Sequence, residues 1–300
     1  MKAIHSRQNI FAVLAALIWG TAFVAQSVGA DYVEPFTFNA SRAAIATVFL
    51  FVLCSILRRG RVKAGKPAAI GSRRDLALGG LCCGTALAVA TALQQKGLET
   101  TTSGKAGFIT ALYIVLVPIA GLFLKKKPPK AIWFSVLLAV AGLYCLCITE
   151  DFTITRGDFY VLLCAFCFTA HIMVIDHFTA KVDGVELSCA QFFVVTVFSA
   201  VGMLLTESPS MEAVLACIGP ILYVGIFSSG VAYTLQILAQ KDSDPTVISV
   251  LLSLESVFAV IAGAIILGDQ MNGKEYFGCA LVMVAVILAQ LPDKKAVSLQ

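Results

Sequence analysis

The sequence has few charged residues. Asp, Glu, Lys and Arg make up 13% of its 300 residues, against about 25% in soluble domains. Apolar residues make up 59% of the chain, where about 45–50% is usual. This scarcity of charge excludes an ordinary soluble domain and indicates an integral membrane protein.

The sequence also lacks the motifs of common enzymes. It contains no G-x-x-x-x-G-K-[ST] segment, so a P-loop ATP site is not expected. The three histidines His5, His171 and His177 do not have the spacing of metal ligands, and neither H-E-x-x-H nor G-x-S-x-G occurs. We therefore expect no cofactor and no bound metal. A polytopic membrane enzyme is the less favoured alternative to a protein without catalytic activity.

The ten cysteines lie in or at the edges of apolar segments, where cysteine behaves as a small hydrophobic residue. Cys164 and Cys167 form a C-x-x-C pair, but no βαβ pattern or further ligand accompanies it. The cysteines therefore do not indicate a redox centre or a zinc site.

What the sequence does contain is a series of apolar segments of membrane-spanning length. A helix needs about 20 apolar residues to cross the hydrocarbon core, and ten such helices nearly fill the chain. We expect an all-α membrane protein with ten transmembrane helices. The predicted spans are residues 8–29, 33–57, 76–95, 106–124, 131–148, 157–177, 187–206, 214–238, 245–267 and 274–291.

The basic residues predict which side each loop faces. With the N-terminus in the cytoplasm, seventeen Lys and Arg residues fall in loops on the inner side and four fall in loops on the outer side. Cytoplasmic loops carry the basic excess, so both termini are expected inside. The basic connector 58–74 then faces lipid headgroups, which are a better partner for it than nucleic acid.

Ten spans divide into two sets of five, residues 1–150 and 151–300. Because five is an odd number, the second set runs upside down relative to the first. Residues 106–123 and 244–261 are weakly similar and precede corresponding final helices. Inverted repeats place a substrate site between the halves near the membrane midplane. We expect one membrane domain built from two inverted five-helix repeats.

Two local features predict details of the helices. Pro118 lies inside the fourth span, opposite Ser256 in the repeat alignment, and proline removes a backbone hydrogen bond there. A gating kink and a tolerated packing kink are both open. The glycines of Gly80-x-x-x-Gly84 predict close approach of a neighbouring helix.

Two charged residues lie near the middle of predicted spans. Glu255 is the only acid of the ninth span, and Arg42 lies about nine residues inside the second. A charged side chain at that depth is unfavourable unless it is paired or faces a polar cavity. We expect Arg42 and Glu255 either to pair directly or to share such a cavity. A structural role in helix packing is the alternative for each.

Other polar and aromatic side chains recur three or four residues apart on single helix faces. Lining a solute path is the favoured interpretation, and interhelical hydrogen bonding or plain packing is the alternative. These candidates are Trp19, Thr21, Thr91, Gln95, Thr110, Tyr113, His171, Tyr233, Gln236 and Gln240.

Two residues are candidates for carrying a proton. His171 lies within the sixth span, and histidine can change charge near neutral pH. A lone histidine within a membrane span is more often a packing residue. Glu255 is therefore the better candidate for proton coupling.

Several short motifs together resemble one transporter family. They are Trp19-Gly20-Thr21-Ala22-Phe23, Arg42, Pro118, Ser253-Leu254-Glu255 and Leu267-Gly268-Asp269. The set resembles the EamA-like branch of the drug/metabolite transporter superfamily over essentially the whole chain. The sequence departs from that pattern at Ser256, where the family often has proline, and at Lys125, where the first repeat often ends in an acid.

The resemblance implies a multi-pass transporter of the bacterial cytoplasmic membrane that exports metabolites such as amino acids by alternating access. The expected partners are a small-molecule solute and the lipid bilayer. The energy would come from the gradient of the solute or from protons. A passive channel is the alternative function, and a monomer and a homodimer are both compatible with the sequence.

Overall fold

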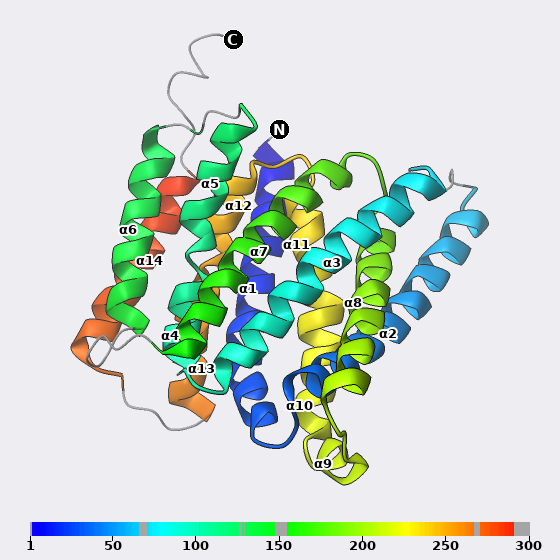
Figure 1. Cartoon of the computed structure of the whole chain (residues 1–300). Helices are drawn as coiled ribbons and strands as arrows, with labels where there is room; N and C mark the ends of the chain where they lie inside the picture. The colour runs from blue at the N-terminus through cyan, green and yellow to red at the C-terminus, as the bar shows by residue number, and fades with distance from the viewer. Residues whose placement is uncertain are drawn as a thin grey trace.

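The computed structural model describes residues 2–65, 71–101, 103–125, 128, 130–147, 155–266 and 271–290. Within them all regular structure is helical (Figure 1). The first half contains α1 (Lys2–Ala30), α2 (Pro35–Lys63), α3 (Arg73–Leu98), α4 (Ser103–Thr110), α5 (Tyr113–Phe123) and α6 (Lys130–Cys147). The second half contains α7 (Arg156–Thr179), α8 (Gly184–Thr206), α9 (Met211–Ala216), α10 (Ile218–Tyr223), the π-helix η1 (Val224–Ala232), α11 (Tyr233–Gln240), α12 (Pro245–Leu252), α13 (Leu254–Ile266) and α14 (Gly273–Ala289).

Each predicted span falls on a helix or on consecutive helices of the part that is described. Eight of these helical stretches are long and apolar enough to cross a membrane. Residues Lys130–Leu146 form a shorter apolar helix, and α14 has 17 residues. The protein is therefore an all-helical, multi-pass membrane protein. The Leu267-Gly268-Asp269 motif and the side chain of His5 lie outside the described residues.

Polar residues fix where several helices begin. Thr155 and Asp158 form a capping box at α7, and Asn272 and Glu275 form one at α14. Such boxes satisfy two of the free N–H groups of a first helical turn. Asp244 caps α12 just before Pro245, which suits the first helical position because it has no N–H to satisfy.

The most extensive helix packing joins the two halves of the sequence. Helix α2 packs along α8, α3 along α7 and α8, α1 along α13, and α6 along α14. Figure 1 shows α14 beside α6 and α8 beside α2. Residues 1–150 and 151–300 are therefore interleaved, and neither half forms its hydrophobic core alone.

Glycines allow the closest of these contacts. A Cβ on Gly84 of α3 would lie 2.5 Å from Cβ of Val194 and 2.7 Å from the Gln191 carbonyl oxygen of α8. A Cβ on Gly80 would lie 2.6 Å from Cβ of Ala190. The close approach predicted from Gly80-x-x-x-Gly84 is confirmed, and its partner is α8.

Helix α2 is also tied to the second half at both ends. Near its N-terminus, the carboxylate of Glu207 accepts hydrogen bonds from the backbone N–H groups of Phe36 and Thr37, each at 2.7 Å. Near its C-terminus, Arg61 forms a 2.7 Å salt bridge with Asp183, which caps α8. These contacts fix the position of α2 along α8.

The glycine contact makes a testable prediction. We expect Gly84→Ala to destabilise the protein by about 1–3 kcal/mol, because the added methyl group overpacks the α3–α8 interface. The matched control is Gly219→Ala in α10, where a Cβ meets nothing within 4 Å. Thermal unfolding in detergent measures both variants. Equal melting temperatures for the two would contradict the proposed close contact.

Candidate functional site

A chamber of about 40 Å³ lies between the two halves of the chain. Every side chain that lines it is 9% exposed or less. Seven lining residues come from residues 1–150 and seven from residues 151–300. They are Trp19, Phe23, Gln26, Arg42, Gln94, Thr110 and Tyr113 in the first half, and Phe168, Ile172, Ser228, Tyr233, Gln236, Leu252 and Glu255 in the second.

Two broken helices meet at this chamber. The span 106–123 is interrupted at Ala111 and Leu112, between α4 and α5, and the span 245–266 is interrupted at Ser253, between α12 and α13. Residues beside both breaks line the chamber. Irregular backbone is tolerated within a membrane where it is buried in protein or lines a cavity. The two breaks therefore bring side chains of α5 and α13 into the site.

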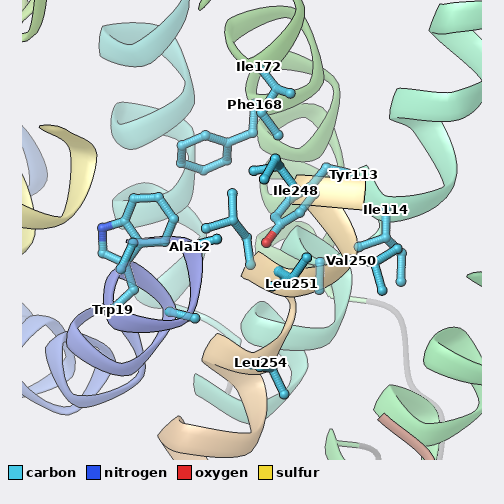
Figure 2. Close-up of a cluster of buried hydrophobic side chains, with 14 of the residues drawn as sticks. Ala12, Trp19, Tyr113, Ile114, Phe168, Ile172, Ile248, Val250, Leu251 and Leu254 are labelled. Atoms are coloured by element: carbon cyan, nitrogen blue, oxygen red, sulfur yellow. The ribbon is translucent and has the colours of Figure 1, made fainter. Parts of the chain in front are cut away.

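The hydroxyl of Tyr113 joins the two breaks. It donates a 3.0 Å hydrogen bond to Oε1 of Glu255, and both side chains are at least 95% buried. The Glu255 carboxyl group therefore has a fixed neutral partner on the other half of the protein. Figure 2 shows the Tyr113 hydroxyl pointing toward the space that Trp19 and Phe168 also approach.

The predicted kink at Pro118 lies beside the first break rather than at it. Pro118 is inside α5, five residues after the helix begins, and does not line the chamber. Its backbone lacks the N–H that would bond to the Ile114 carbonyl oxygen. The interruption itself lies one turn earlier, where Ile114 N–H bonds to Ala111 O at 3.0 Å in a tighter turn.

The π-helical segment η1 places Ser228 on the same face as the chamber-lining side chains of α11. In η1 the chain bonds residues five apart, and the N–H of Tyr233 continues this pattern to the carbonyl oxygen of Ser228. Residues i and i+5 therefore lie above one another, so Ser228 and Tyr233 face the same chamber. Single π-helical turns often occur at functional sites. Gln236 follows one turn later on the same face.

Arg42 is held by neutral amides. Its Nε donates to Oδ1 of Asn39 at 2.8 Å, and its Nη1 lies 3.5 Å from Oε1 of Gln26. Asn39 in turn donates to the backbone carbonyl oxygen of Thr91 at 3.2 Å. The salt bridges among the described side chains do not include one between Arg42 and Glu255. Of the two arrangements expected for this pair, the structure contains the shared cavity.

Aromatic rings form much of the remaining wall. The rings of Trp19 and Tyr233 meet edge to face, with centroids 4.7 Å apart. Tyr233 also contacts Phe192 and His171, at centroid distances of 5.5 Å and 6.0 Å. This cluster fixes Tyr233 between the chamber and α7 and α8.

Two chamber-lining side chains carry buried polar atoms without a protein partner in the described part of the chain. They are the Nε1 donor of Trp19 and the Oε1 acceptor of Gln236. An unsatisfied buried polar group costs about 1–3 kcal/mol. The chamber therefore offers one donor and one acceptor, in addition to Arg42 and Glu255, to a polar solute or to water.

Seven residues predicted as site candidates line the chamber: Trp19, Arg42, Thr110, Tyr113, Tyr233, Gln236 and Glu255. Five other candidates lie elsewhere, and each has a defined position. Gln240 Nε2 donates to the Ile172 carbonyl oxygen at 2.8 Å. Thr21 Oγ1 lies 2.5 Å from the Tyr223 hydroxyl, Thr91 accepts the Asn39 bond, and Gln95 donates to the backbone carbonyl oxygen of Gln26 at 3.4 Å. His171 lies behind Tyr233, with Nε2 3.0 Å from Oε1 of Gln191.

Several residues that line the chamber were not predicted from the sequence. Phe23 and Gln26 follow Trp19 by four and seven residues, so the helical period alone could have selected them. Gln94 and Phe168 carry no comparable signal. Ser228 is five residues from Tyr233, and only the π-helical segment places it on the same face. Among the described residues, no three His, Cys, Asp or Glu side chains cluster closely enough to hold a metal ion.

Sequence relationships give the class of protein to which this buried chamber belongs. The chain matches the EamA-like transporter family over residues 7–148 and 155–291, and it belongs to that family. The predicted resemblance to the EamA-like branch is thereby confirmed, and the protein is a transporter rather than an enzyme.

Individual relatives are also named as transporters. An uncharacterized transporter of Archaeoglobus fulgidus is 32% identical over 279 residues, which cover 93% of this chain and 84% of the relative. The uncharacterized transporter YwfM of Bacillus subtilis is 24% identical over 96% of this chain and 95% of its own. A probable terminal-alkyne amino-acid exporter of Streptantibioticus cattleyicolor is 25% identical over 74% of this chain and 72% of its own.

The fold is also found in a solved crystal structure. The two structures superpose with a TM-score of 0.78 over 95% of this chain and 96% of the other, at 19% sequence identity. At that level of identity the comparison concerns the fold alone.

The bond between Tyr113 and Glu255 can be tested by a double-mutant cycle. We expect Tyr113→Phe and Glu255→Leu, which has no acceptor for the Tyr113 hydroxyl, to be coupled by about 0.5–3 kcal/mol in the free energy of unfolding, as is usual for buried hydrogen-bonded partners. Thermal unfolding of both single variants and the double variant measures the coupling. The control pair is Tyr144→Phe with Glu255→Leu, since Tyr144 is 47% exposed on α6. Additive effects for Tyr113 and Glu255 would contradict the assigned bond.

Proposed function

We propose that this protein is a secondary transporter that exports small zwitterionic metabolites, amino acids in particular, by alternating access. The observation that carries the proposal is the chamber, to which the two halves contribute equally. A guanidinium and a carboxyl group line it without neutralising each other. Groups of opposite charge that are both held by neutral partners remain available to a solute that carries both charges.

The lining supports an amino acid as the solute class. Arg42 and the free donor of Trp19 suit a carboxylate, since guanidinium groups bind carboxylates well. Glu255 and the free acceptor of Gln236 suit an ammonium group. The aromatic rings of Trp19, Tyr233 and Phe168 suit an apolar side chain. The relative named as a probable amino-acid exporter supports the same class.

The packing of the helices supports the architecture of ten spans in two inverted five-helix repeats, residues 1–150 and 151–300. A two-fold relation between the halves requires contacts to occur in reciprocal pairs. The contact of α1 with α13 corresponds to the contact of α7 with α4 and α5. The contact of α3 with α7 corresponds to the contact of η1 and α11 with α1. The pairs α2–α8 and α6–α14 each join corresponding helices of the two halves, so exchanging the halves leaves these pairs unchanged. Five spans in each half would then invert one repeat relative to the other.

The size of the chamber supports a carrier over a passive channel. One water occupies at least about 10–15 Å³ by the same kind of measure, so about 40 Å³ has room for only a few waters. An amino acid needs the chamber to widen. Because all lining side chains are buried, widening to one side at a time fits alternating access. The breaks beside Thr110 and Ser253, with Pro118 in α5, are the proposed points of bending.

Protons are the proposed coupling ion, with Glu255 as their carrier. Its carboxyl group lies within the substrate chamber and bonds to a neutral phenol, so solute and proton would compete for one group. His171 lies outside the chamber lining and is the weaker candidate. The proposed location is a bacterial cytoplasmic membrane with both termini inside, as the distribution of basic residues predicts.

Counterflow tests the transport function and its solute class. In liposomes preloaded with unlabelled leucine, we expect saturable uptake of labelled leucine. 4-Methylpentanoate and 3-methylbutylamine, which each carry one of the two charges, should compete poorly. Arg42→Gln should weaken apparent affinity by about 10- to 100-fold, because a charged hydrogen bond contributes about 1.5–3 kcal/mol. Arg58→Gln, on the exposed part of the same helix, is the matched control. Flux that rises linearly with concentration would indicate a channel instead.

An imposed proton gradient tests the role of Glu255. We expect the wild-type protein to accumulate labelled leucine against its gradient when a proton gradient drives it. Glu255→Gln, assayed at saturating leucine, should still exchange leucine but should no longer accumulate it, since an amide does not titrate. Glu186→Gln, at the surface, should behave as the wild-type protein does. Proton-driven accumulation by Glu255→Gln would assign coupling to another group.

A further inference from the structure

A second pocket lies at the end of the molecule where α1 passes into α2. Its volume is about 360 Å³, which is within the usual range of about 300–1,000 Å³ for small-molecule sites. We call this pocket the vestibule. It is lined by Ala30, Asp31, Tyr32, Val33, Glu34, Pro35, Gln95 and Glu99.

Residues Gln95 and Gln26 connect the linings of the vestibule and the chamber. Gln95 lines the vestibule, and Gln26 lines the chamber. The two meet through the 3.4 Å bond from Gln95 Nε2 to the Gln26 carbonyl oxygen. Gln94, next to Gln95 in α3, already faces the chamber and bonds to Thr110. One hydrogen bond thus spans the boundary between the two cavities.

The polar groups of the vestibule are mainly acceptors. Asp31, Glu34 and Glu99 contribute carboxylates. Gln95 is 1% exposed, and its Oε1 has no hydrogen-bond partner in the described part of the chain. A buried acceptor without a donor calls for one from a ligand. Lys96 forms a 2.6 Å salt bridge with Glu99. Asp31 and Glu34 are then the carboxylates of the vestibule without a salt bridge among the described side chains.

We propose that the vestibule binds the cationic group of a solute, an ammonium in particular, and that the contact between Gln95 and Gln26 is the gate between vestibule and chamber. The carboxylates attract the cation, and Gln95 Oε1 accepts one of its N–H groups. The solute then reaches the chamber when Gln95 releases Gln26. The gating role rests on the proposed transport function, whereas the cation site does not depend on it.

Fluorescence of Trp19 tests the gate. The chain has two tryptophans, so Trp133→Phe leaves Trp19 as the only one, on the chamber wall. We expect Gln95→Ala in this background to increase quenching of Trp19 by acrylamide at least twofold. Gln191→Ala removes an equally buried glutamine that lines neither cavity and should leave quenching unchanged. Gln95→Asn, which is too short to reach Gln26, should act as Gln95→Ala does if the alanine variant fails to fold.

A tryptophan placed in the vestibule tests the cation site independently. Tyr32 is 50% exposed at its edge, so Tyr32→Trp in a Trp19→Phe/Trp133→Phe protein reports on the vestibule alone. We expect caesium to quench it at least twice as strongly as iodide. Replacement of Asp31 and Glu34 by their amides should remove that preference without changing acrylamide quenching. Methylammonium should protect against caesium better than tetramethylammonium, which has no N–H donor.

Each result decides one part of the proposal. Unchanged acrylamide quenching of Trp19 in both Gln95 variants would overturn the gate. Equal quenching by caesium and iodide in the vestibule, or a caesium preference that survives the amide substitutions, would overturn the cation site. These measurements need no transport, so absence of leucine counterflow would count against the proposed function while leaving the quenching results intact.

Discussion

The arrangement of the first three helices depends on one buried cation. A charged side chain at the centre of a bilayer costs at least about 2.5–3.5 kcal/mol when it is left to lipid. Arg42 avoids this cost through the amide oxygens of Asn39 and Gln26. Those amides are themselves held, since Asn39 donates to the Thr91 carbonyl oxygen and the Gln26 amide donates to the Ala22 carbonyl oxygen. Gln95 of α3 donates in turn to the backbone carbonyl oxygen of Gln26. Solvating one guanidinium therefore fixes the relative positions of α1, α2 and α3.

Three departures from regular helix geometry lie beside the chamber. The breaks at Ala111–Leu112 and Ser253, and the π-helical segment Val224–Ala232, each place a lining side chain that an unbroken α-helix would direct elsewhere. Within a membrane such irregular backbone needs protein partners or a polar cavity. Polar side chains and irregular backbone thus support one another, and this mutual dependence explains why the chamber lies at the meeting point of the two halves.

The sequence predicted the helices well because their signal is composition over about 20 residues, which no tertiary contact has to supply. It also selected Arg42 and Glu255 from their depth alone. It did not distinguish pairing from a shared cavity, since that depends on side-chain geometry. Gln95 lies one helical position from Gln94, so a rotation of about 100° decides which of them faces the chamber. Ser228 was missed because the π-helical bonding changes the period on which the prediction relied.

The contacts between helices divide into two kinds, and this division constrains how the protein can move. Pairs such as α3–α8 and α6–α14 approach closely at glycines, where a Cβ on Gly84 or Gly278 would lie within 3 Å of the neighbouring helix. Separating such surfaces loses many close van der Waals contacts at once. By contrast, single hydrogen bonds connect Tyr113 to Glu255 and Gln95 to Gln26. A net cost of about 0.5–1.5 kcal/mol for breaking a hydrogen bond is readily met by a bound solute. Motion should therefore carry the glycine-packed pairs as rigid units and open the chamber at these single bonds.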